Sequence, residues 1–264
     1  SYTADAACQA GSAGFAYDGQ GRLTAAPGAA YAWDGFSRLT NAGGAALSYN
    51  GVDQVTERVE AGQTNRFFYN YGVGMAPVVA EQNGNTGAFT RYYVWTPDGA
   101  LLYGIDVATG NQPFYYHFDV VGTTLALTDA GGAVADAYAC DPHGRVLQHT
   151  GANPQPFVFV GRYGVRRDGG TLYQMRARYY DAKLGRFLSR EPLWPRLNAG
   201  PALNPYAYAA NDPISKVDIS GLTTLEEIAC QFDKLSAERD ELMWQLGLLK
   251  MHADTILEEA ALDD

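Results

Sequence analysis

The chain has 264 residues, of which 47% are hydrophobic and 18% charged, with 30 glycines and 18 tyrosines; this composition indicates a turn-rich β protein. The formal net charge of −10 is uneven, because residues 223–264 carry a net charge of −8 and residues 1–222 one of −2. This balance argues against nucleic acid or an anionic membrane as the main partner, and no apolar run approaches the ~18 residues of a membrane span.

The first residues, 1–15, mix small, polar and apolar side chains and specify no clear element. Three similar stretches then recur every 16 residues, at Tyr17–Thr24, Trp33–Thr40 and Tyr49–Thr56. Each runs from an aromatic residue through Asp-Gly or Asn-Gly to a long polar residue, an aliphatic residue and Thr. Asp-Gly and Asn-Gly are expected to supply the positive-φ residues of tight hairpin turns, between strand-forming flanks. The repetition predicts strand–turn–strand units and a sheet that winds onward.

The same pattern continues more loosely at residues 91–102, 128–134 and 138–146. Roughly thirteen to sixteen short strands are expected over residues 16–190. The tyrosines are expected to pack between strands and line the inner face of the sheet; an exposed, glycan-binding row of aromatic rings is the other interpretation. Residues 176–222 then form a distinct block rich in Arg, Tyr and Pro.

A different pattern begins at residue 223. Thr224-Leu-Glu-Glu227 has the form of a capping box, which starts a helix. Apolar residues then follow a heptad spacing at Ile228, Leu235, Leu242, Leu249 and Ile256, with Leu225, Phe232, Arg239, Leu246, Ala253 and Ala260 interleaved. This predicts a long acidic amphipathic helix within residues 223–264. The helix either packs along the β region, forms a coiled coil with a second copy or a helical partner, or folds into a helical hairpin.

Cofactor and metal sites have no sequence signal here. The three cysteines, Cys8, Cys140 and Cys230, fit no disulfide framework, and no Cys or His spacing is typical of a metal site. We therefore expect no cofactor and no metal. The sequence also shows no signal peptide.

The repeats and the block at residues 176–222 together resemble the Rhs/YD-repeat family. Tyr17–Leu23 matches the family repeat Tyr-Asp-x-x-Gly-Arg-Leu. The block resembles the motifs that end the family core, in the order Arg178-Tyr-Tyr-Asp181, Gly185-Arg-Phe-Leu188, Asn204-Pro-Tyr-Ala-Tyr208, Asn211-Asp-Pro213 and Asp218-Ile-Ser-Gly-Leu222. The resemblance covers about residues 15–222, and this ordered set of motifs is highly specific.

The resemblance implies a hollow β shell that encloses a C-terminal segment, usually a toxin, and separates it by self-cleavage after the Gly-Leu pair. Members are delivered by type VI secretion machines or as the C component of insecticidal toxin complexes, and teneurins are animal relatives. By this analogy, residues 1–15 precede a YD-repeat shell at residues 16–222, and residues 223–264 are its cargo. We also expect synthesis in a bacterial cytoplasm, export without a signal peptide, and further shell or secretion machinery as partners.

This chain departs from the family pattern in three respects. Its repeat region is much shorter than a family shell, so it is a terminal fragment, a reduced member or a subunit of an assembly, such as a homo-oligomer. Ile219 stands where the family has Pro, and Glu191 stands where the family commonly has Asp.

Two carboxylates can hydrolyse a peptide bond without a metal, because one activates water while the other, protonated, donates to the scissile carbonyl. By analogy with the family, Asp218 and Glu191 are the candidate pair for an aspartyl-protease-like, single-turnover cleavage between Leu222 and Thr223. The other interpretations are a turn-forming role for Asp218, a surface ion pair for Glu191, and attack on the Leu222 carbonyl by the Thr223 hydroxyl.

Three further residues support the expected site. Arg190 is carried over from the family as the group that holds the second carboxylate or the developing oxyanion. Gly221 lets the chain lie flat beside those groups because it lacks a Cβ, and Pro213 opens the closing motif. The main hypothesis is therefore a self-cleaving shell for toxin delivery; the alternative is a non-catalytic scaffold whose C-terminal helix pairs with itself or with a partner.

Overall fold

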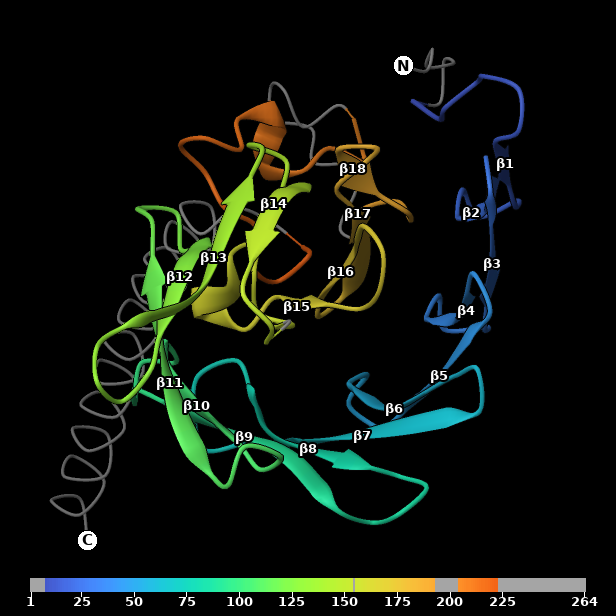
Figure 1. Ribbon diagram of the computed structural model, residues 1–264. Coiled ribbons are helices and arrows are strands. Elements are labelled where there is room, and N and C mark those ends of the chain that lie inside the picture. The colour runs from blue at the N-terminus through green and yellow to red at the C-terminus, as the bar shows by residue number, and fades with distance from the viewer. Residues whose placement is uncertain (1–7, 154, 193–203, 223–264) are drawn as a thin grey trace, which may run out of the picture. The chain divides into compact units, whose positions relative to one another are not determined.

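The computed structural model describes residues 8–153, 155–192 and 204–222 (Figure 1). The chain divides into two compact units, Ser1–Thr224 and Leu225–Asp264. The second unit, and with it the expected helix, lies outside the described residues. In the described part, the helical segments η1 (Gly161–Tyr163) and η3 (Ala209–Asn211) are single 3₁₀ turns, and no helix there has the length and apolarity to cross a bilayer.

Most of the first unit is one antiparallel sheet of 14 strands in which every strand pairs with its neighbours in sequence. The sheet curves continuously from β1 to β14, as Figure 1 shows. Its strands are β1 (Ala16–Tyr17), β2 (Leu23–Ala26), β3 (Ala29–Trp33), β4 (Leu39–Ala42), β5 (Ala45–Tyr49), β6 (Val55–Glu60), β7 (Gln63–Tyr69), β8 (Val78–Asn83), β9 (Phe89–Trp95), β10 (Leu101–Asp106), β11 (Gln112–Phe118), β12 (Thr124–Thr128), β13 (Val134–Cys140) and β14 (Val146–Thr150).

A second antiparallel sheet of four strands follows, with the order β15-β16-β17-β18. Its strands are β15 (Arg166–Arg167), β16 (Leu172–Met175), β17 (Arg178–Asp181) and β18 (Arg186–Phe187). The mainly β prediction is thus confirmed for the described residues. Eighteen strands are present there, more than expected, because β1, β15 and β18 are two-residue strands too short to leave a pattern in the sequence.

The repeats fold as predicted into hairpins, but the positive-φ residue was assigned to the wrong position. Positive φ occurs at Gly21, Ser37 and Asp53, three residues after the Asp or Asn, and not at the glycine next to it. In the first repeat the backbone N–H of Gly21 donates to the Asp18 carbonyl at 2.9 Å, and the Asp18 carboxylate accepts the N–H groups of Gln20 and Arg22. The turn is therefore a type I turn closed by a left-handed bulge residue.

The remaining positions of the repeat also have identifiable contacts. Arg22 Nε donates to Asp18 Oδ2 at 2.6 Å, and Arg38 repeats this contact with Asp34 at 2.7 Å. The aromatic residue binds the repeat before it, since the Trp33 indole donates to the Leu23 carbonyl at 2.8 Å. Equivalent bonds join Tyr49 to Leu39, Tyr69 to Val55 and Trp95 to Val78. Each repeat is thereby tied to its predecessor by side chains as well as by strand pairing.

One contiguous core lies between the large sheet and the residues that follow it. The repeat aliphatics are almost fully buried there, with Leu23 and Leu39 each 1% exposed. Phe157, Val158, Tyr179 and Leu188 pack into the same core from beyond β14. The tyrosine prediction holds in part: Tyr173, Tyr179 and Tyr180 are buried, whereas Tyr115 is 41% exposed.

The last described residues also contact the first repeat. The backbone N–H of Leu23 donates to the carbonyl of Leu188 at 2.8 Å, and the Tyr206 hydroxyl donates to the carbonyl of Gly21 at 2.7 Å. These two bonds fix the segment that follows β18 against β2 and the turn before it. That segment carries Glu191, one of the expected site residues.

Candidate functional site

Arg178 lies at the centre of the candidate site. It opens β17 and is buried, and its guanidinium stacks 3.5 Å from the ring centroid of Phe187 in the neighbouring strand β18. Its Nη2 lies 2.8 Å from Glu191 Oε2 and 3.4 Å from Asp218 Oδ2. One nitrogen atom therefore joins the two carboxylates that the sequence analysis singled out, although they are 27 residues apart.

Asp218 is held by the short segment that it begins. Its side chain is buried, and Oδ1 accepts the backbone N–H of Gly221 at 2.8 Å and the Ser220 hydroxyl at 3.2 Å. The Ser220 carbonyl in turn accepts the backbone N–H of Ala177 at 3.1 Å. These bonds fold residues 218–221 into a tight loop against the start of β17, with the carboxylate facing Arg178. The turn-forming role that was set against catalysis for Asp218 is thus present together with the contact to Arg178.

Glu191 reaches the site through the β17–β18 hairpin. Tyr180 pairs with Phe187 in that hairpin, and the N–H of Leu188 donates to the Tyr179 carbonyl, which brings the following residues alongside Arg178. The backbone N–H of Glu191 donates to the Pro205 carbonyl at 2.8 Å, which fixes its position. Its side chain is 14% exposed, so Glu191 is the more solvent-accessible member of the pair.

Arg190 precedes Glu191 in the chain. It is exposed, and its side chain packs against Gly21 in the first repeat. Arg178 contacts both carboxylates. The role expected of Arg190, to hold the second carboxylate or the developing oxyanion, stays a prediction. Pro213 is half-buried in the loop after η3. Thr223 lies outside the described residues.

Two arginines bind the backbone that leads to the expected cleavage point. Arg178 Nε donates to the Gly221 carbonyl, and Arg176 Nη1 donates to the Ile219 carbonyl. Gly221 has φ +70°, and a Cβ there would overlap the carbonyl oxygen of Met175 and lie 2.9 Å from the backbone nitrogen of Arg178. Only a glycine fits this close approach without strain. The segment that ends at Leu222, whose N–H donates to Ser220 Oγ at 3.1 Å, is thus held on both sides.

Burial and charge act in opposite directions on these arginines. Burial lowers the pKa of Arg178, and the carboxylates of Glu191 and Asp218 only partly offset this effect. Burial likewise lowers the pKa of Arg176 to about 10. Arg176 therefore remains a cation at neutral pH. Arg178 therefore stabilises negative charge on the two carboxylates and on any oxygen that develops charge next to them.

A cavity of about 780 Å³ gives solvent a route to the pair. Arg178 and Glu191 line it, together with Arg176 and Ala177 and, from the large sheet, repeat residues such as Trp33 and Tyr49. Asp218 is not in the cavity lining and lies behind Arg178. Water can therefore reach Glu191 from the cavity, while Asp218 faces the bound segment 218–221.

Arg178 was not identified as a site residue from the sequence. It was read only as part of a family motif, although one signal was available: an arginine at the start of an apolar, aromatic strand must find an acidic partner once it is buried. The motif names no partner, because Glu191 and Asp218 approach it only through the hairpin and the closing loop. Ser220, a donor to Asp218, was likewise not singled out.

The family model for the teneurin YD-shell matches residues 3–214 of this chain. Among curated proteins, Toxin protein Tse5 of Pseudomonas aeruginosa is 38% identical over 108 residues, which is 41% of this chain and 8% of that protein. Teneurin-1 of Gallus gallus is 29% identical over 174 residues, 64% of this chain and 6% of the relative.

The fold also matches solved structures. A crystal structure of TcdB2-TccC3-Cdc42 superposes with a TM-score of 0.60 at 18% identity, covering 78% of this chain and 11% of that one. A structure of the Photorhabdus luminescens Tc holotoxin pore gives a TM-score of 0.60 at 21% identity, covering 78% and 10%. The chain thus spans about a tenth or less of the length of these relatives, and the structural likeness shows the fold.

Proposed function

Because the chain belongs to the teneurin YD-shell family, we propose that it forms the closing part of a toxin-delivery shell and cleaves itself after Leu222. The observation that carries this proposal is the shared contact of Arg178 with Glu191 and Asp218, next to a backbone segment that Arg178 itself binds. Relatives of this chain include a protein named as a toxin. On this proposal, residues 223–264 are the released segment, and the protein is exported as part of a larger delivery assembly.

The chemistry assigns different tasks to the two carboxylates. Glu191 faces the cavity and takes a proton from a water molecule, whose oxygen then attacks the Leu222 carbonyl carbon. The bond from that carbon to the Thr223 nitrogen breaks, and the proton passes to the departing amine. Asp218 holds residues 218–221 in place through the Gly221 N–H and the Ser220 hydroxyl. Arg178 offsets the negative charge that builds up during attack.

This scheme modifies the carboxylate pair expected from the sequence. Two carboxylates that share a proton keep one member neutral, whereas a guanidinium between them stabilises negative charge on both. Attack by the Thr223 hydroxyl remains the competing route to the same cleavage. The two routes differ in one test, because Thr223→Val removes the hydroxyl and leaves the carboxylates intact.

The decisive experiment is mass spectrometry of the freshly purified full chain over time. We expect two fragments, residues 1–222 and 223–264, in the wild type, and a cleavage rate at least ~100-fold lower in Glu191→Gln and Asp218→Asn. Asp129→Asn, in a distant exposed turn, is the matched control and should cleave like the wild type. Thr223→Val should also cleave. Cleavage of Glu191→Gln and Asp218→Asn at the wild-type rate would remove the proposal.

If the wild-type chain is not cleaved, the same contacts favour a second function, that of a structural scaffold. Arg178 and Arg176 bind three backbone groups of residues 205–221, which is also what a purely structural clamp needs. In that case Asp218→Asn lowers stability without any change in covalent mass, and the chain acts as a scaffold. Light scattering before and after deletion of residues 225–264 then tests whether this segment mediates assembly.

A further inference from the structure

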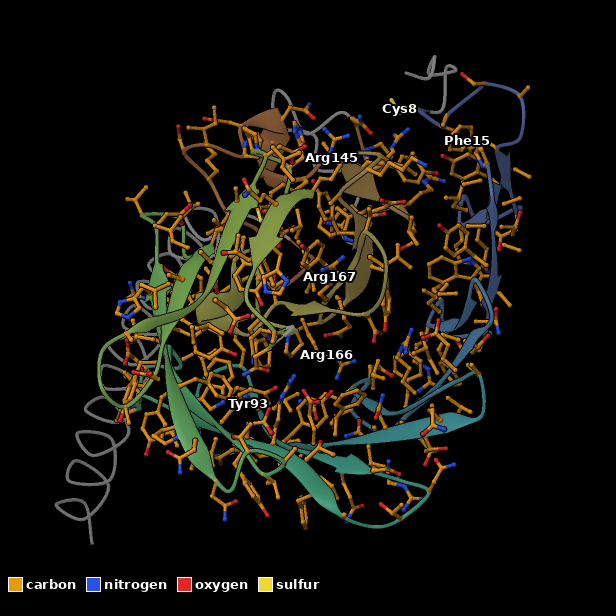
Figure 2. All side chains as sticks on the ribbon, viewed as in Figure 1. Cys8, Phe15, Tyr93, Arg145, Arg166 and Arg167 are labelled. Carbon is orange, nitrogen blue, oxygen red and sulfur yellow. The ribbon has the colours of Figure 1, made fainter. Side chains whose placement is uncertain are left out.

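Arg166 is a buried arginine whose guanidinium nitrogens have no hydrogen-bond partner among the described residues. The residue is 2% exposed, and its Nε, Nη1 and Nη2 atoms are all fully buried and unpaired in this sense. It lies in β15, and its guanidinium sits 3.5 Å from the ring centroid of Phe67 in β7. Figure 2 shows Arg166 between β15 and the strands β7 and β8 of the large sheet. A buried cation whose N–H groups donate no hydrogen bond is costly, by several kcal/mol in typical proteins.

The carboxylate of Asp168 forms an ion pair with Arg166 but accepts no hydrogen bond from it. Asp168 Oδ2 lies 3.6 Å from Arg166 Nη2, too far for a hydrogen bond. The same carboxylate already accepts the Tyr179 hydroxyl at 2.5 Å and lies 3.3 Å from Arg58 Nε. Burial lowers the pKa of Arg166, but the charge of Asp168 and the hydroxyls of Tyr69 and Tyr179 raise it above its usual value. Arg166 is therefore charged, and its N–H groups are still able to donate hydrogen bonds.

Arg166 lines the same cavity of about 780 Å³ that reaches the acidic pair. Two other arginines in its lining, Arg22 and Arg38, are paired with the aspartates of their own repeat turns. Arg176 donates only to backbone carbonyls, of Met75, Tyr163 and Ile219, and no carboxylate of the described residues lies within ion-pair distance of it. Six arginines and two carboxylates, those of Asp53 and Glu191, line this cavity, so its wall is cationic in a protein whose residues 1–222 carry a net charge of −2.

We propose that Arg166 binds a carboxylate that enters this cavity, presented either by an acidic peptide side chain or by a small organic acid. A carboxylate matches the planar fork of an arginine and forms two parallel hydrogen bonds with it. It carries one charge, as does the Arg166 guanidinium. A phosphate carries nearly two and fits this charge balance less well. The site does not depend on self-cleavage, because Arg166 contacts neither Glu191 nor Asp218 in the described structure.

The test measures ligand binding to the full chain by calorimetry and by the shift in melting temperature. The probes are glutarate, hexaglutamate, hexaglutamine and inorganic phosphate, all at one ionic strength. We expect glutarate or hexaglutamate, and not hexaglutamine, to bind and to raise the melting temperature. Binding of hexaglutamate alone identifies a peptide ligand, and binding of glutarate as well identifies a small acid.

Two variants and one control complete the design. Arg166→Met replaces the guanidinium by an uncharged side chain of similar size and should weaken binding at least tenfold. The melting temperature without ligand should stay equal or rise. Arg166→Lys, the second variant, retains the charge without the fork and should bind with intermediate affinity. Arg66→Met, at a half-exposed arginine paired with Glu57 and outside the cavity lining, should bind like the wild type.

Three results would overturn the proposal. They are the absence of binding to the wild type, unchanged binding in both Arg166 variants, and phosphate binding as tight as that of glutarate. None of these results tests cleavage after Leu222, which is measured separately by mass spectrometry of the chain.

Discussion

Gly221 is a residue on which the geometry of the acidic site depends. Its positive φ and its closeness to Met175 and Arg178 leave no room for a side chain. Gly28 has a similar positive φ, but a Cβ there would meet no atom within 4 Å. Substitution of Gly28 therefore measures the energetic cost of a left-handed backbone alone. Substitution of Gly221 measures that cost together with the cost of the steric overlap.

We expect Gly221→Ala to lower the free energy of unfolding by about 2–3 kcal/mol and to slow cleavage at least tenfold, because the loop of Asp218 must move away from Arg178. Gly28→Ala should cost only about 1 kcal/mol and leave cleavage unchanged. Urea denaturation and intact mass measure the two effects. A Gly221→Ala chain that cleaves like the wild type would show that this close approach is not needed for the reaction.

The residues of the site were partly predictable. Asp218 and Glu191 were found because the family motif fixes their positions in the sequence, and the structure does bring both to one arginine. The contact of Arg178 with both carboxylates was not predictable, because Arg178 reaches Glu191 only across a strand pair.

The element that repeats along this sheet is a type I turn with a left-handed fourth residue. The aspartate accepts two backbone N–H groups and an arginine, so the turn holds together even where its left-handed position is not glycine. Burial raises the pKa of Asp34, but hydrogen bonds from Arg38 and Phe36 more than offset this, and the pKa lies below its usual value. Ser37, with φ +64°, and Asp53, with φ +61°, occupy the strained position.

Ser37→Gly should raise the free energy of unfolding by about 0.5–1 kcal/mol, because glycine adopts a left-handed conformation without a steric penalty. Gly35→Ala is the matched control: its φ is not in the positive range, a Cβ added there would meet no atom within 4 Å, and little change is expected. Urea denaturation of both variants measures the difference. A destabilised Ser37→Gly would mean that the weak contact of the serine hydroxyl with Arg22, at 3.4 Å, outweighs the strain.

At the level of strands, the sequence predicted well where the repeat is regular and poorly where it is not. The hairpins at residues 17–56 follow from the Asp-Gly and Asn-Gly pattern. The turn at Asp119 has the same bonds, to the N–H groups of Val121 and Thr123, but was overlooked because no glycine follows its aspartate. The positive-φ position was misassigned because a two-residue hairpin turn and a type I turn with a bulge share the same Asp-Gly start.

Buried tyrosines connect the stability of the whole β unit to alkaline pH. Burial, with a smaller effect from Asp181, raises the pKa of Tyr31 to about 12, and burial also raises the pKa of Tyr138 to about 12. Each group holds its proton more tightly in the folded chain than in the unfolded chain, where its pKa is about 10. Their contribution to stability is therefore complete below pH ~10 and is lost as the pH rises to about 12.

Because burial also raises the pKa of the Cys140 thiol from 9 to about 11, we expect the free energy of unfolding to begin to fall near pH ~9. It should fall more steeply above pH ~10, by about 1.4 kcal/mol per pH unit for each such tyrosine. Urea denaturation at a series of pH values, with tyrosinate absorbance followed in parallel, measures the slope. Tyr31→Phe should make the slope shallower. Equal stability at pH 9 and pH 11.5 would contradict the prediction that ionisation of these tyrosines is coupled to unfolding.

The bonds between the first repeat and the last described residues have a consequence for the order of events in the cell. During translation Gly21 and Leu23 are synthesised well before Leu188 and Tyr206. The two bonds between these residues can therefore form only late in synthesis. Glu191 lies between these late anchors. Under the self-cleavage proposed above, a nascent chain that ends before Leu188 lacks Glu191 and is expected to stay uncleaved, so cleavage would report that synthesis has passed this segment.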